Sequence, residues 1–395
     1  MTHPTISVSD IARATGLVFI GLLLMVFSDA CSEKGPEANS PTGRPISQGR
    51  GDTMPALVEA LTTFKAQGLF YDGNSPSVVD DPVALNRFLQ RNDPNAIFLL
   101  PEEFSAFQVS HKANYAGVGM EIEKRESGEI VCFPMPDSPA QQAGIEKGDR
   151  IDAIDGQSVA GQSVYVVASW LMGAGGTRVN IWIVKKGGGR HRVDVVRERI
   201  QTHSVTVEKA SGLTIVKIHY FDSGTKRQLQ YALEELPLGT RLVLDLRDNP
   251  GGDLFKSIDA AMLFLKKGAP IVTIKSRDAV QPYRSTTAAY YTAYPLVIWQ
   301  NENTASAAEV FVAALTENRR ALSIGLKSYG KGTTQEVAEL SDGSALIFTS
   351  GYLLPPNGKR YHHRGLKPSR ALTADSTSIT AFMKETERIF KERTE

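Results

Sequence analysis

A serine and a lysine are the residues of this 395-residue chain that could form a reactive pair. Ser306 stands in the segment NTASAAE, shortly after the apolar stretch YPLVIWQN and at the start of a predicted helix. Lys331 follows 25 residues later, between two glycines in SYGKGTTQ. A hydroxyl at the carboxyl end of a strand lies where open α/β sheets build their sites, and a lysine can act as its base. Taken alone, the serine is typical of a helix cap and the lysine of a solvated turn.

Two neighbouring segments carry groups that could assist this pair. Gln335 follows the lysine by four residues, so its amide could orient the lysine amine. The sequence LVLDLRDNPGG predicts a buried strand followed by a turn that contains Gly251 and Gly252, whose backbone N–H groups could face a ligand. One helix and one returning strand separate Ser306 from Lys331, which would bring both side chains to the same end of a sheet.

The elements that must position these residues alternate between strand and helix. Strand patterns occur at 213–221, 241–247, 270–277, 294–301 and 321–332, and helix patterns at 225–236, 257–268 and 305–318. This alternation predicts an α/β core with a mostly parallel sheet. Residues before the core show two helix patterns, at 55–70 and 81–90, and then short strands with glycine turns. We therefore expect a small N-terminal helical segment at 54–112, an inserted domain at 113–200, a core at 201–372 and a C-terminal helix within 373–395.

Composition excludes several classes of function. Lys and Arg total 44 against 43 Asp and Glu, a net charge of +1, and no basic stripe is present. Nucleic-acid binding is therefore not expected. The chain has two cysteines, and its seven histidines show no metal-binding spacing. We expect no metal and no other cofactor.

The amino end has the pattern of an export signal. Arg13 precedes an uncharged run, GLVFIGLLLMVF, which is too short to span a bilayer comfortably. Cys31 follows Ala30 as in a bacterial lipoprotein box, which would make Cys31 the lipidated residue. A lipoprotein, an ordinary cleaved signal and an uncleaved anchor all stay open for residues 1–31. Each reading predicts export to the periplasm or cell envelope, and 32–53 has the composition of a flexible linker.

The inserted region resembles a PDZ domain of the circularly permuted bacterial type. The resemblance is carried by the phrase SPAQQAGIEKGDRIDAIDG, which begins at Ser138. It implies that the loop of Gly117, Val118, Gly119 and Met120 binds a peptide's terminal carboxylate through successive N–H groups. The bound peptide would add as a strand to the edge of the sheet.

Four phrases together resemble the carboxyl-terminal processing proteases, serine peptidases of family S41. They are SPAQQAGIEKGDRIDAIDG, LVLDLRDNPGG, NENTASAAE and SYGKGTTQ, in the order that the family has them. The resemblance implies that Ser306 is the nucleophile, Lys331 the general base and Gln335 the residue that orients the lysine. It implies an oxyanion hole built from the N–H of Ala307 and that of either Gly251 or Gly252. The implied substrates are proteins or peptides with free carboxyl-terminal tails, bound by the PDZ domain.

Other readings stay open beside this one. The chain could be a latent or inactive PDZ peptide-binding protein that needs an adaptor protein. It could also degrade unfolded proteins generally rather than process particular ones, a difference that the residues do not decide. A homo-oligomer, with a contact through the helical segment at 54–112, and membrane attachment through the amino end are further expectations.

Overall fold

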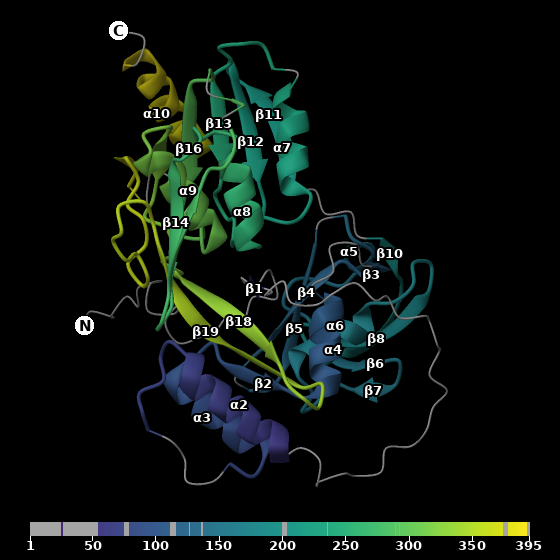
Figure 1. The fold of residues 1–395 in the computed structure, drawn as a ribbon. Helices are drawn as coiled ribbons and strands as arrows, with labels where there is room; N and C mark the ends of the chain where they lie inside the picture. The colour runs from purple at the N-terminus through teal and green to yellow at the C-terminus, as the bar shows by residue number, and fades with distance from the viewer. Residues whose placement is uncertain are drawn as a thin grey trace, which may run out of the picture. The chain divides into compact units, whose positions relative to one another are not determined.

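The structure, a computed structural model, describes residues 25–26, 54–74, 79–110, 116–125, 127–135, 137–199, 204–234, 236–288, 290–291, 293–373 and 378–392 (Figure 1). The chain divides into two compact units. The smaller unit contains Glu102–Ser204, and the larger unit contains Leu24–Pro101 and Val205–Glu395. Cys31 and the linker at 32–53 lie outside the described residues, and the domain boundaries given above stay predictions. No helix of the described residues is long and apolar enough to cross a bilayer.

The larger unit is built around a mostly parallel sheet, as predicted. Its strands, in spatial order, are β11 (Val205–Ala210), β12 (Leu213–Ile218), β13 (Leu242–Asp245), β16 (Leu296–Gln300), β17 (Leu322–Gly325) and β20 (Arg370–Ala371). β11 pairs antiparallel with β12, and all later neighbours pair parallel. The central strands β13 and β16 are buried throughout their length, as continuous apolar runs require. Their carboxyl ends lie side by side, because Asp245 is in register with Trp299.

Helices cover both faces of this sheet (Figure 1). They are α7 (Thr225–Glu234), α8 (Leu254–Ala261), α9 (Ala307–Glu317) and α10 (Ile379–Glu392). Leu244 on β13 shares one apolar core with residues of α7, α8 and α9. The next residue back along the strand, Val243, faces a second core that Phe382 and Phe390 of α10 complete. This alternation is the period-two pattern of a strand buried on both faces.

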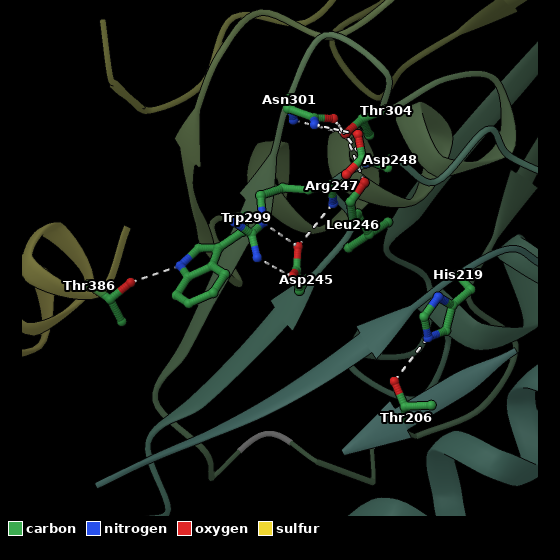
Figure 2. Close-up of polar contacts among 10 residues, drawn as sticks. All are labelled: Thr206, His219, Asp245, Leu246, Arg247, Asp248, Trp299, Asn301, Thr304 and Thr386. Carbon is green, nitrogen blue, oxygen red and sulfur yellow. Dashed lines mark hydrogen bonds and ion pairs between the residues drawn. The ribbon is translucent and has the colours of Figure 1, made fainter. Parts of the chain in front are cut away.

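The C-terminal helix is fixed to the sheet near the end of β16 (Figure 2). The Trp299 indole N–H donates to Thr386 Oγ1 over 2.8 Å. The Arg247 guanidinium pairs with Asp245 at 2.6 Å and lies 4.8 Å from the ring centres of both Trp299 and Phe382. Stacking on the two rings and pairing with the carboxylate hold this side chain in one position.

A second, mainly antiparallel sheet completes the larger unit. Its order is β1 (Met25–Val26), β18 (Thr333–Glu339), β19 (Ala345–Leu354), β14 (Pro270–Lys275) and β15 (Val280–Arg284), with β2 (Ile97–Leu99) also on β19. Helices α2 (Met54–Gln67) and α3 (Pro82–Asn92) pack on this sheet through an apolar core that includes Phe64, Leu85 and Phe348. The two helices predicted from the sequence at 55–70 and 81–90 are thus present, with shifted ends.

Two predicted elements differ from those observed. The helix expected at 257–268 begins at Leu254, because Asp253 caps it by accepting hydrogen bonds from Phe255 N–H and Lys256 N–H. It ends at Ala261. The strand expected at 321–332 stops at Gly325, where φ is 129°, and an irregular segment leads to β18. That irregular segment carries Lys331.

The smaller unit is an antiparallel sheet with short helices. Its sheet order is β4 (Met120–Lys124), β5 (Ile130–Pro134), β6 (Arg150–Ile154), β8 (Arg178–Val184) and β9 (Arg190–Val196), with β7 (Gln157–Ser158) on β6. β3 (Ala116–Gly117) pairs with β10 (Glu198–Arg199), and the helices are α4 (Pro101–Ser110), α5 (Pro139–Gln142) and α6 (Val164–Leu171). β4 lies at the edge of the sheet, so one side of its backbone is unpaired within the sheet.

Candidate active site

Ser306 lies at the start of α9, but its side chain does not act as a helix cap. Its hydroxyl oxygen is buried and has no hydrogen-bond partner among the described residues. The backbone at Ser306 has φ 61° and ψ −123°, a conformation that a residue with a Cβ adopts only under strain. Its N–H donates to the Glu309 carboxylate at 2.9 Å, which fixes the turn. A strained backbone and an unpaired buried hydroxyl distinguish this serine from an ordinary N-cap.

Glu309, in the first turn of α9, connects the serine to the lysine segment. Its Oε2 accepts the N–H of Ser306 at 2.9 Å and the N–H of Lys331 at 2.8 Å. Its Oε1 accepts the Ser328 hydroxyl at 2.5 Å and the N–H of Gly330 at 2.7 Å. The backbones of Ser306 and Lys331 are therefore both bonded to one carboxylate oxygen. Burial raises the pKa of Glu309 to about 7, although its four donors act in the opposite direction.

Lys331 sits in a turn that only glycines can flank. A Cβ on Gly330 would lie 2.7 Å from the backbone nitrogen of Gly365, and one on Gly332 would lie 2.9 Å from that of His362. Burial lowers the pKa of Lys331, while the charge of Glu309 acts to raise it. A lysine held partly out of water is nearer to the neutral form that a base requires.

Gln335 is close in sequence but is not bonded to the lysine. It lies on β18, where its Nε2 donates to the carbonyl of Asn95 at 3.3 Å. Its Oε1 is buried and has no donor among the described residues. The structure thus leaves Gln335 with one unused acceptor.

The turn after β13 approaches the serine closely and supplies backbone donors. The N–H of Gly251 is already used, because it donates to Asn249 Oδ1 at 2.8 Å. The N–H groups of Gly252 and Ala307 donate to no described residue. Of the two glycines considered from the sequence, Gly252 is therefore the one whose N–H has no partner among the described residues. The N–H of Ala307 is the second donor of this kind.

Gly251 is nevertheless essential to this geometry. Its φ is 113°, and a Cβ there would lie 2.7 Å from Ser306 Cβ and 3.0 Å from Ala307 N. We expect Gly251→Ala to lower the rate of any reaction at Ser306 at least tenfold, since the serine turn must move to admit the methyl group. Initial rates beside a thermal melt measure this. Gly343→Ala is the control, because Gly343 also has a positive φ, 85°, but has no neighbour nearer than 3.9 Å. Equal losses in both variants would contradict the prediction.

Some residues around the lysine were not found from the sequence. Glu309 follows Ser306 by three residues, the spacing of a capping box, and that signal could have identified it. His362 accepts the N–H of Gly332 at Nδ1 over 3.3 Å, and burial with the nearby positive groups lowers its pKa to about 4. The Tyr361 hydroxyl is buried without a partner among the described residues, and burial raises its pKa well above the ordinary value. No sequence signal marks these last two residues.

The smaller unit has its own pocket at the predicted carboxylate loop. Gly117, Val118, Gly119 and Met120 line it, at the start of the edge strand β4. The remaining lining residues are mainly apolar and come from β4, α6 and the segments beside them: Glu121, Ile122, Met135, Ala168, Leu171 and Met172. An apolar pocket beside an open strand edge is the arrangement that binds an extended peptide.

Comparisons with known proteins agree with this architecture. Residues 212–371 match the model of peptidase family S41, and residues 130–185 match that of a PDZ domain. The chain thus contains a peptidase family S41 domain at 212–371 and a PDZ domain at 130–185.

Relatives of known name support the same assignment. A probable CtpA-like serine protease of Staphylococcus haemolyticus is 31% identical over 286 residues, 71% of this chain and 58% of that protein. One from Staphylococcus aureus is 32% identical over 280 residues, 70% of this chain and 56% of that protein. This chain thus spans little more than half the length of these relatives.

Solved structures show the same fold. The photosystem II D1 C-terminal processing protease is 26% identical, with a TM-score of 0.61 over 85% of this chain and 97% of that one. A putative S41 protease from Bacteroides fragilis, 16% identical with a TM-score of 0.50, covers 90% of this chain and shares the fold.

Proposed function

We propose that the protein is a serine endopeptidase that recognises the carboxyl-terminal tails of protein substrates and cleaves their peptide bonds. The observation that carries the proposal is the state of Ser306: a buried hydroxyl without a partner among the described residues, in a strained turn. Glu309 joins that turn to the segment of Lys331. The names of the relatives and the family assignment support hydrolysis of peptide bonds.

In the proposed mechanism, neutral Lys331 takes the proton of the Ser306 hydroxyl as its oxygen attacks the substrate carbonyl. The N–H groups of Gly252 and Ala307 stabilise the oxyanion of the tetrahedral intermediate. Protonated Lys331 then gives its proton to the leaving amine, and an acyl-enzyme on Ser306 remains. Water, deprotonated by Lys331, attacks the ester, and the proton returns to the Ser306 oxygen as the product acid leaves.

Gln335 has a supporting role in this proposal. Its unused Oε1 can accept a hydrogen bond from the Lys331 amine and orient it toward the serine. The present bond from Gln335 Nε2 to the Asn95 carbonyl is 3.3 Å long and therefore weak. The side chain can give up this bond and turn toward the lysine when substrate binds.

The tail of the substrate would bind in the pocket of the smaller unit. Its carboxylate would meet the N–H groups of the loop from Gly117 to Met120, and its backbone would pair with the free edge of β4. The apolar lining from β4 and α6 favours tails that end in apolar residues. The proposal also includes export to the cell envelope with anchoring through Cys31, which the amino-terminal sequence supports. It includes regulation by an adaptor protein or by self-association, which the family resemblance supports.

The test compares two forms of one substrate. A disordered protein with an apolar carboxyl-terminal tail is prepared once as the free acid and once with that carboxylate amidated. We expect the free acid to be cleaved at least tenfold faster at low substrate concentration, because the amide removes the charge that the loop binds. Fragment release is followed by mass spectrometry. Absence of cleavage would refute a peptidase that acts without an adaptor, and equal rates would refute recognition of the carboxylate.

A further inference from the structure

Two turns position the N–H groups of Gly252 and Ala307, which donate to no described residue, and several polar contacts join these turns. One turn follows β13 and carries Gly252; the other follows β16 and leads into Ala307, the first residue of α9. Within them, Thr304 Oγ1 donates to the Leu246 carbonyl at 2.8 Å, as Figure 2 shows. Ala305 N–H donates to the Asn249 carbonyl at 2.9 Å. The separation of the two donors thus depends on how the two turns are bonded to each other.

Asp248 makes the outermost of these connections. Its Oδ1 accepts the side-chain amides of Asn301 and Asn303, each at 2.8 Å. Its own N–H donates to Asn301 Oδ1 at 3.0 Å (Figure 2). The three residues therefore form a closed set of bonds across the gap between the turns, which we call the Asp248 clamp.

The backbone of Asp248 is shaped for this contact. Its φ is 62°, in the left-handed region that costs energy for a residue with a Cβ, although aspartate tolerates it better than most. Partial burial acts to raise the pKa of Asp248, but the bonds from Asn303 and Asn301, with Lys217 and Arg247 nearby, bring it below its ordinary value. The side chain is consequently a carboxylate at neutral pH, and an anionic acceptor makes the stronger bonds.

The clamp lies at the surface, which separates it from the core that stabilises the fold. Asp248 and Asn303 are exposed, whereas the neighbouring Thr304 and Asn249 are buried. Exposed polar contacts contribute little to global stability, because water replaces them readily. Their consequence is local: they restrict the relative position of the two turns.

We propose that Asp248, held by Asn301 and Asn303, is a positioning residue that sets the distance between the Gly252 and Ala307 N–H groups for binding the oxyanion. This inference rests on the proposed peptidase function. Donors act on the oxyanion only at about 2.7–3.1 Å, so a displacement of either N–H group by well below 1 Å already weakens the stabilisation of the transition state. The clamp touches neither the nucleophile nor the pocket for the tail, so substrate affinity should not depend on it.

Asp248→Gly is the informative variant. Glycine adopts a φ of 62° without strain, so the change removes the carboxylate bonds and adds no backbone conflict. We expect kcat to fall about tenfold with KM and tail-peptide affinity unchanged, and Tm to shift by no more than about 3 °C. Asp248→Asn keeps one acceptor oxygen and tolerates the same φ, so it should retain activity within about threefold of the wild type.

The matched control is Asp155→Gly in the smaller unit. Asp155 also has a positive φ, 46°, and its carboxylate also bonds to a segment distant in sequence, by accepting the N–H of Asn180 on β8 at 2.8 Å. It lies outside the site and the tail pocket, so this variant should leave kcat and KM unchanged. A loss of kcat in both variants would attribute the effect to added glycine flexibility and overturn the inference.

A double-mutant cycle with Asn303→Ala completes the experiment. If the clamp acts as one unit, Asn303→Ala should lower kcat in the wild type but have little further effect in Asp248→Gly. Each of three results would overturn the inference: full additivity, an unchanged kcat in Asp248→Gly, or a loss of kcat that is explained by unfolding. In each case, cleavage by the wild type would still support the proposed peptidase function. If the wild type itself cleaves nothing, the proposed function fails first and this role fails with it.

Discussion

Ser306→Ala and Lys331→Ala are each expected to abolish cleavage, lowering kcat by about 10⁴-fold while the fold persists. Ser306→Ala removes the attacking oxygen. Its neighbours lose no hydrogen bond, because the hydroxyl has no partner among the described residues. Lys331→Ala removes the base but leaves the backbone N–H that Glu309 accepts. The two single variants and the double variant should be about equally inactive, since each removes a part that the other cannot replace.

The form of the pH profile separates this lysine base from other bases. Because burial lowers the pKa of Lys331, the neutral amine should gain population, and kcat should rise, as pH increases toward the alkaline range. Lys331→Arg should stay inactive at every pH, since a guanidinium is not deprotonated in proteins. Rates are measured from about pH 6 to pH 10, with circular dichroism as the check on folding. An active Lys331→Arg variant would rule out the lysine as base.

The main elements of the fold follow from patterns that the sequence displays openly. β13 and β16 are continuous apolar runs, and α9 is an uninterrupted helix former, so their prediction is correct to within a few residues. The start of α8 depends on the single cap Asp253, which precedes the apolar pattern and was therefore missed. The hairpin of β18 and β19 was also missed. Its β18 half is largely polar, and its burial depends on α2 and α3, which are distant in sequence.

The candidate site was predictable as a set of segments but not as a set of contacts. The phrases around Ser306, Lys331 and Gly251–Gly252 identify which residues gather at the site. Sequence alone could not choose between the two glycines, because the choice depends on where Asn249 directs its side chain. The function of Glu309 was equally hidden, since three of its four donors come from residues 328–331. Such contacts are long-range, and no local period or spacing encodes them.

Glu309→Gln is expected to lower both activity and stability, because the four donors around this side chain use every acceptor position of a carboxylate. An amide offers a single acceptor oxygen and places an NH₂ group against the remaining donors. We expect kcat to fall at least tenfold, as the Lys331 segment loses its anchor, and the free energy of unfolding to fall by about 2 kcal/mol. The control is Glu59→Gln, a half-buried carboxylate that accepts two bonds from Ser341. That variant should retain full activity.

The same substitution should change how stability depends on pH. The pKa of Glu309 is raised from 4.5 to about 7 in the folded protein, so the folded state keeps this proton to a higher pH than the unfolded chain. Its contribution therefore destabilises the fold as pH rises from 4.5 to 7, by up to about 3 kcal/mol. His362 acts oppositely: its pKa is lowered from 6.5 to about 4, so its contribution is lost as pH falls across that window.

Comparison of two denaturation series isolates the glutamate from the histidine. Because the histidine is common to both proteins, the difference in unfolding free energy between wild type and Glu309→Gln reports Glu309 alone. Relative to the variant, the wild type should lose stability as pH rises toward neutrality. A difference that does not vary with pH would mean that the pKa of Glu309 is the same in the folded protein and in the unfolded chain. Its four donors would then offset the effect of burial, and the carboxylate that joins the serine turn to the lysine segment would be ionised at neutral pH.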